Sequence, residues 1–139
     1  MPRRLEAAYR ATDYVIEAPA GAFTLRVDEP SAALAGLHAR HGVRCSAFIS
    51  ACNPASVPQS AADNEAAHAR LLAAVRRTDL ACIEGWGRDP TGAWPSERSV
   101  VVLGITEELA RRLAAGFGQN ALLYAHADAV PRLLWISRT

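Results

Sequence analysis

The apolar residues of this chain follow two kinds of spacing, one typical of strands and one typical of helices. Residues 23–27 alternate strictly between apolar and polar positions, a pattern typical of a strand with one exposed face. Residues 45–51 and 99–105 are almost continuously apolar, which favours strands buried on both faces. Apolar residues recur at helical spacing after Ser31, Ser60 and Thr106, and each of these residues suits a helix N-cap. The pattern therefore predicts a chain that mixes strands and helices.

These signals predict an ordered set of elements. The expected strands cover residues 14–17, 23–27, 45–51, 80–84, 99–105, 120–125 and 132–136, and the expected helices cover 31–41, 60–77 and 106–115. Residues 1–11 are expected to form an N-terminal arm or a short helix. The order strand–strand–helix–strand–helix–strand–strand–helix–strand–strand predicts one α+β domain over residues 1–139. We expect a mixed β-sheet with about three helices packed on it.

Composition narrows the class of protein. The chain has 139 residues, half of them hydrophobic, and a net charge of +1 with arginine as its only basic residue besides histidine. This balance gives no strong signal for nucleic acid or an anionic membrane. No apolar run reaches the ~18 residues of a membrane span, and the first residues do not resemble a secretory signal. We therefore expect a cytoplasmic protein, with Cys45, Cys52 and Cys82 as buried reduced thiols.

Chain order predicts where the polar residues meet. A strand–helix–strand crossover normally gives two strands of the same direction, so residues 23–27, 45–51 and 80–84 should end at one edge of the sheet. The strands that begin near residues 14, 99 and 120 should start there. Ligands of open α/β sheets tend to sit outside strand carboxyl ends. The side chains expected at this edge are Thr12, Asn53, Ser56, Asn64, Arg88, Asp89, Trp94, Glu97, Ser99, Gln119 and Asn120.

Glu97 is the candidate catalytic residue, as a general acid or base. Paired with Asp89 or Glu84 it could also hold a divalent cation, or it could form an ion pair with Arg88 or Arg98. We identify no specific metal site, and the sequence leaves any cofactor unknown. The candidate ligand-binding residues are Asn53, Ser56, Asn64, Arg88, Trp94, Ser99, Gln119 and Asn120. The competing interpretation is that these amides and hydroxyls satisfy the loop backbone and cap the next helix.

Other chemistry has weaker support in the sequence. Trp86 and Trp94 lie in the expected loop 85–98, where they could stack on a flat ligand or cover the edge of the core. The histidines lack the spacing of a metal-binding helix pair. Cys52 beside Asn53 is a possible nucleophile, although no histidine partner can be assigned to it from sequence.

Three motifs carry a resemblance to a known family. They are FISACNPAS (48–56), GWGRDPTGAWPSERS (85–99) and FGQNA (117–121). Together they resemble the domain-of-unknown-function family numbered 3293, with similarity from about Tyr9 to Leu134. Ser50 and Cys52 depart from the Thr and Trp expected there, which could reshape the floor of a pocket. The resemblance implies a bacterial single-domain protein and supplies no reaction.

Two functional hypotheses follow. The first is binding, with or without turnover, of a small polar, phosphorylated or nucleotide-like ligand at the edge around Asn53. The alternative is a non-catalytic protein-interaction or regulatory module that uses the Trp86/Trp94 loop. The sequence leaves open whether the protein is an enzyme and what its oligomeric state is.

Overall fold

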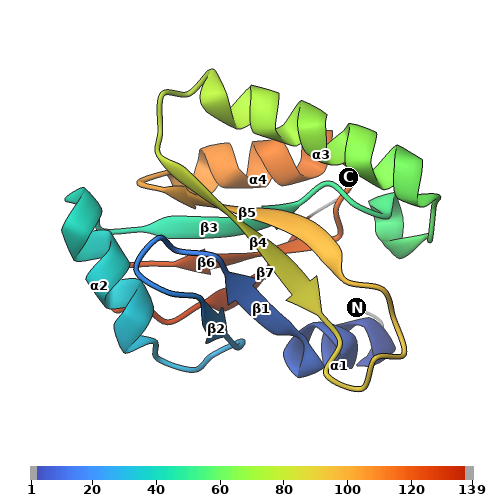
Figure 1. Ribbon diagram of the computed structural model, residues 1–139, viewed down its shortest axis with the longest axis horizontal. Helices are drawn as coiled ribbons and strands as arrows, with labels where there is room; N and C mark the ends of the chain where they lie inside the picture. The colour runs from blue at the N-terminus through green and yellow to red at the C-terminus, as the bar shows by residue number, and fades with distance from the viewer. Residues whose placement is uncertain (1–2, 137–139) are drawn as a thin grey trace.

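A computed structural model describes residues 3–136 (Figure 1). Its helices are α1 (Arg3–Ala11), α2 (Ala32–His41), α3 (Ala61–Arg76) and α4 (Glu107–Gly116), with a short 3-10 turn, η1 (Pro54–Ser56). Its strands are β1 (Asp13–Ile16), β2 (Phe23–Leu25), β3 (Ser46–Ser50), β4 (Cys82–Arg88), β5 (Glu97–Leu103), β6 (Ala121–Ala125) and β7 (Arg132–Trp135). The α+β class and the expected element order are confirmed. The predicted arm is the helix α1, although residues 1 and 2 lie outside the described range.

All the strands form one sheet in the order β2-β1-β4-β5-β3-β6-β7. Every neighbouring pair is antiparallel, so the expected mixed sheet is corrected to an antiparallel one. The physical reason is the position of β5, which lies between β3 and β4 and runs against both. Strands β2, β3 and β4 do share a direction, as the crossover argument predicts, but they are not neighbours.

The sheet separates two hydrophobic clusters. Successive residues of a strand face opposite sides, and β5 shows this directly: Val100 and Val102 pack with α3 and α4, whereas Val101 and Leu103 pack with α2. In Figure 1, α3 and α4 lie together over one face of the sheet. Because β3 and β5 are covered on both sides, their continuous apolar runs are explained by burial.

The expected helix caps are present. The side chains of Ser31, Ser60 and Thr106 each accept a hydrogen bond from a backbone N–H in the first turn of their helix. Gly42 ends α2 in the left-handed conformation with φ 64°, where glycine has no steric penalty. Local sequence chemistry therefore fixes these boundaries.

Strand β4 extends beyond Glu84, the predicted end of this strand, into the segment 85–98 that the sequence predicts to be a loop. The paired strand continues to Arg88, and the connection to β5 covers only residues 89–96. Gly85 allows this pairing: a Cβ at that position would lie 2.4 Å from the carbonyl oxygen of Val15 on β1. Here glycine serves a close approach between strands rather than a turn.

Candidate functional site

Strand direction gathers several polar segments at one edge of the sheet. Asn53 follows the end of β3, Glu97 begins β5, and Gln119 and Asn120 immediately precede β6. Because β5 and β6 both run against β3, the end of β3 and the starts of its two neighbours lie at the same edge. The predicted convergence of these segments is therefore found, in an antiparallel sheet.

Asn53 is the centre of a hydrogen-bonded cluster. Its backbone N–H donates to Oδ1 of Asn64 at 2.9 Å, and its own Oδ1 accepts from Nδ2 of Asn64 at 3.0 Å. The same Oδ1 accepts from the backbone N–H of Gln59 at 3.0 Å, and Nε2 of Gln59 donates to Asn64 at 2.8 Å. The two asparagines thus join the loop after β3 to the first turns of α3.

The loop itself has an uncommon backbone conformation. Asn53, Ala55 and Ser56 have φ values of 47°, 57° and 61°, in the left-handed region that disfavours residues with a side chain. The backbone N–H of Ala55 donates to the carbonyl of Gly118 at 2.7 Å, and Nδ2 of Asn120 donates to Oγ of Ser56 at 2.8 Å. Contacts from the segment after α4 therefore hold a strained turn in place.

The same segment leaves no room for a side chain at Gly118. A Cβ there would lie 2.9 Å from Cβ of Pro54, and its φ is 70°. The next residue, Gln119, is buried, and its Nε2 donates to the carbonyls of Cys52 at 3.0 Å and Phe117 at 3.3 Å. The FGQNA motif thus packs against the loop after β3 and donates a hydrogen bond to it.

Glu97 presents a carboxylate to this cluster. Its Oε2 accepts from Nδ2 of Asn53 at 2.5 Å, and no partner is found for Oε1 among residues 3–136. Partial burial raises the pKa of Glu97, and the Asn53 hydrogen bond opposes that rise. Negative charge on Glu97 also contributes to raising the pKa of the buried Tyr14 and Cys52 side chains, after their own burial. Glu97 is a partly buried acid with one oxygen available.

The expected alternatives for Glu97 are not formed. Arg88 pairs with Asp13 at 3.3 Å, and Arg98 pairs with Glu65 and Glu84. Asp89 accepts hydrogen bonds from Thr91 within its own loop. The predictions of an ion pair with Arg88 or Arg98 are therefore wrong, and so is a carboxylate pair with Asp89 or Glu84.

Other predicted site residues lie apart from the Asn53 cluster. Trp94 is 67% exposed on the β4–β5 loop, and Arg88 is exposed at the end of β4. Ser99 is buried, and its hydroxyl donates to the carbonyl of Glu97 at 3.4 Å. The hydroxyl of Thr12 donates to Ala8 in α1. None of these side chains has a hydrogen bond to Asn53 in the described part of the chain.

A second polar network lies on the opposite face. Glu84 accepts from Arg98 at 2.5 Å and contacts Nε2 of the buried His68 at 2.9 Å, and Arg98 also pairs with Glu65 at 3.1 Å. The guanidinium lies 5.2 Å from the ring centre of Trp86. Hydrogen bonds from His68 and Arg98 lower the pKa of Glu84. This network is not evident from the sequence, because it depends on β4 pairing with β5 beneath α3.

Gln59 is a member of the Asn53 cluster that the sequence does not predict. Its position directly before the Ser60 cap is a weak signal, since loop residues there are commonly polar. Gln59 also lines an open cleft of about 440 Å³ between α3 and the turn after α4. Neither Asn53 nor Glu97 lines this cleft.

The described residues contain no group of three or more His, Cys, Asp and Glu side chains that could hold a metal ion. Cys52 is buried, its thiol donates to the carbonyl of Arg98 at 3.6 Å, and burial raises the pKa of that thiol. A raised pKa disfavours the reactive thiolate. The geometry therefore favours packing over nucleophilic chemistry for Cys52.

Comparison with known proteins gives one finding. A family model described as "Protein of unknown function (DUF3293)" matches residues 49–122, more than half of the chain. No curated protein and no solved structure matches the chain. No helix between residues 3 and 136 has both the length and the apolar character needed to cross a bilayer. The match covers the end of β3, the Asn53 loop, Glu97 and the FGQNA segment, and this chain belongs to the family of proteins of unknown function DUF3293.

Proposed function

We propose that the protein binds a small polar ligand at the sheet edge around Asn53, with Glu97 as the group that contacts it. The single observation that carries this proposal is the carboxylate itself. Glu97 is partly buried, Asn53 holds one of its oxygens, and the other has no partner among the described residues. A carboxylate removed from water without a compensating cation is unfavourable for folding. Such groups concentrate at functional sites.

In this proposal the neighbouring amides position the acid. Asn64 and Gln59 fix Asn53, and Asn53 fixes one oxygen of Glu97. Gln119 and Asn120 hold the loop from the other side. These residues, with Ser56, orient the site through the loop, whereas Glu97 makes the contact. A group that binds a ligand needs neighbouring hydrogen bonds to hold its geometry, and these amides supply them for Glu97.

Charge constrains the ligand. The free oxygen of an ionised Glu97 accepts hydrogen bonds and repels anions, so the ligand should offer a hydroxyl, amide or amine at this point. A phosphorylated or nucleotide-like ligand would approach Glu97 through its sugar or base, with its phosphate directed away. With its pKa raised by burial, Glu97 could also exchange a proton with the ligand, which is the role of a general acid or base.

A thermal-shift screen tests the proposal. Wild type, Glu97→Gln and the control Glu108→Gln would be screened against nucleosides, nucleotides, sugars, sugar phosphates and small amines. Glu108 is an exposed acid on α4 with a side chain 81% exposed. We expect at least one compound class to stabilise wild type and Glu108→Gln but not Glu97→Gln. Equal shifts in all three proteins, or none in wild type, would count against the site.

A second candidate function rests on Trp94. This side chain is 67% exposed on the β4–β5 loop, and large exposed aromatic groups are enriched at protein interfaces. Trp86 does not share this role, because its indole N–H donates to Glu17 and its ring is covered by Arg98. If the loop binds a partner or a second copy, Trp94→Ser should lower that association without changing stability. Sedimentation of both proteins over a concentration series would measure self-association.

A further inference from the structure

The cleft between α3 and the turn after α4 has features of a second binding site. Its volume of about 440 Å³ lies within the range of roughly 300–1,000 Å³ typical of small-molecule sites. Ala51 and Ala67 form a buried apolar floor, and Phe117 adds part of its ring. Glu97 does not line this cleft, so the inference concerns a different surface from the function proposed above.

Small side chains line the cleft at positions where larger side chains would fit. Gly116 lines it, and a Cβ at that position would meet no atom within 4 Å. Gly116 also lies outside the left-handed region, so alanine would fit and would favour the helix. Ala66 lines the wall from α3 and is exposed. A larger residue at either position could fill the hollow.

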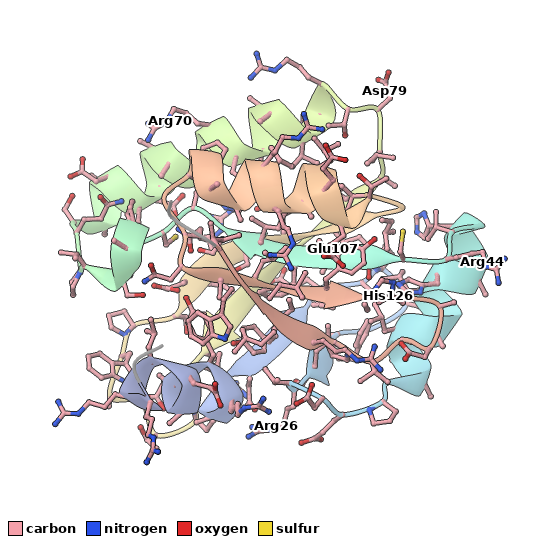
Figure 2. All side chains as sticks on the ribbon, turned by 180° about the vertical axis from the view of Figure 1, so that it is seen from behind. Arg26, Arg44, Arg70, Asp79, Glu107 and His126 are labelled. Atoms are coloured by element: carbon pink, nitrogen blue, oxygen red, sulfur yellow. The ribbon has the colours of Figure 1, made fainter. Side chains whose placement is uncertain are left out.

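Two side chains of opposite charge lie at the rim of the cleft. Asp63 and Arg70 both line the cleft from α3, two turns apart, which places their Cα atoms about 10 Å apart along the helix axis. Neither has an ion-pair partner among residues 3–136. Arg70 lies on the outer side of α3, where Figure 2 shows its guanidinium directed away from the sheet. The rim thus offers one anion and one cation across an apolar floor.

We propose that this cleft binds a small elongated zwitterion of the size of a dipeptide or an ω-amino acid. Its ammonium group meets Asp63, its carboxylate meets Arg70, and its apolar spacer lies along Ala67 and Phe117. The planar guanidinium suits a carboxylate. Two exposed ion pairs contribute little by themselves, so affinity depends on a spacer that satisfies both ends and covers the floor.

A chain-length series tests this directly. Calorimetric titrations would use unbranched ω-amino acids from β-alanine to aminooctanoate, with the alkyl carboxylate and the alkyl amine of each length as matched controls. We expect saturable binding that is tightest at one chain length of the series, the length at which both charged ends are met. At that length the zwitterion should bind at least tenfold more tightly than either single-charge analogue. Equal binding of the alkyl carboxylates, or no saturable binding, would overturn the proposal.

Matched variants locate the site. Asp63→Asn and Arg70→Gln should each weaken binding at least fivefold, and Ala66→Leu should abolish it by filling the cleft. The controls Asp79→Asn and Arg76→Gln change exposed charges that do not line the cleft, and they should bind as wild type does. Unchanged binding in Arg70→Gln or in a folded Ala66→Leu would refute the assignment. If Ala66→Leu does not fold, the two exposed charge variants decide the question.

Discussion

Asn64→Ala tests whether the asparagine pair holds the loop that positions Glu97. The change removes an acceptor for the backbone N–H of Asn53 at 2.9 Å and for Nε2 of Gln59 at 2.8 Å, and a donor to Oδ1 of Asn53 at 3.0 Å. A buried donor left without a partner costs about 1–3 kcal/mol, and an ordinary hydrogen bond contributes about 0.5–1.5 kcal/mol. Because water can reach this partly buried loop, we expect a loss of about 2–3 kcal/mol.

Helix propensity makes this prediction sharper. Asn64 lies in α3, and alanine is a better helix former than asparagine by about 0.5 kcal/mol. Propensity alone therefore predicts a gain in stability, opposite in sign to the loss expected from the hydrogen bonds. Asn64→Asp is the matched control, since it keeps the acceptor for both donors and places a carboxylate near a helix N-terminus. It should lose less than half as much as Asn64→Ala.

Urea unfolding followed by circular dichroism would give both free energies of unfolding. For a domain of this size the loss in Asn64→Ala corresponds to a fall of about 6–12 °C in Tm. A change smaller than about 0.5 kcal/mol, or a gain in stability, would show that the loop does not depend on Asn64. Equal losses in Asn64→Ala and Asn64→Asp would show that the acceptor is not the important part.

Three further predictions follow from single contacts. Gly85→Ala would place a Cβ 2.4 Å from the Val15 carbonyl and should cost at least about 1–3 kcal/mol in urea unfolding. Gly87→Ala, whose Cβ would lie 3.8 Å from Cγ2 of Thr12, should be close to neutral. Burial lowers the pKa of His38 from 6.5, so folding stability should fall as pH drops below about 6.5, and His38→Gln should flatten that dependence. Burial raises the pKa of Glu97 above 4.5, so Glu97→Gln should gain stability relative to wild type as pH rises from 4 to 7; a parallel pair of pH profiles would contradict this.

Much of the fold follows from local sequence signals. The caps at Ser31, Ser60 and Thr106 set helix starts that the structure confirms. The apolar runs of β3 and β5 predict strands that are covered on both faces. Strand directions followed from crossover geometry, which is a property of chain order. Strand neighbours did not, because insertion of β5 between β3 and β4 depends on long-range pairing that no local pattern records.

The same distinction between chain order and long-range pairing applies to the candidate site. Asn53 and Glu97 could be placed at one edge from chain order, but their direct contact could not. The bond between Arg98 and Glu84 depends on β4 continuing through Gly85, which looks like a loop residue in sequence. Close approach of two backbones favours glycine as strongly as a turn does. A glycine in the sequence therefore does not by itself distinguish a close approach of two strands from a turn.

The most direct test of the central claim is an NMR titration that follows the side-chain amide of Asn53 and the side-chain carboxyl of Glu97. The titrants would be the polar compounds that stabilise the wild-type protein. We expect that at least one of them shifts both signals together, in a saturable way, and that Glu97→Gln abolishes the shift at the Asn53 amide. Binding that leaves both signals unchanged, or that perturbs only the Trp94 loop, would contradict it.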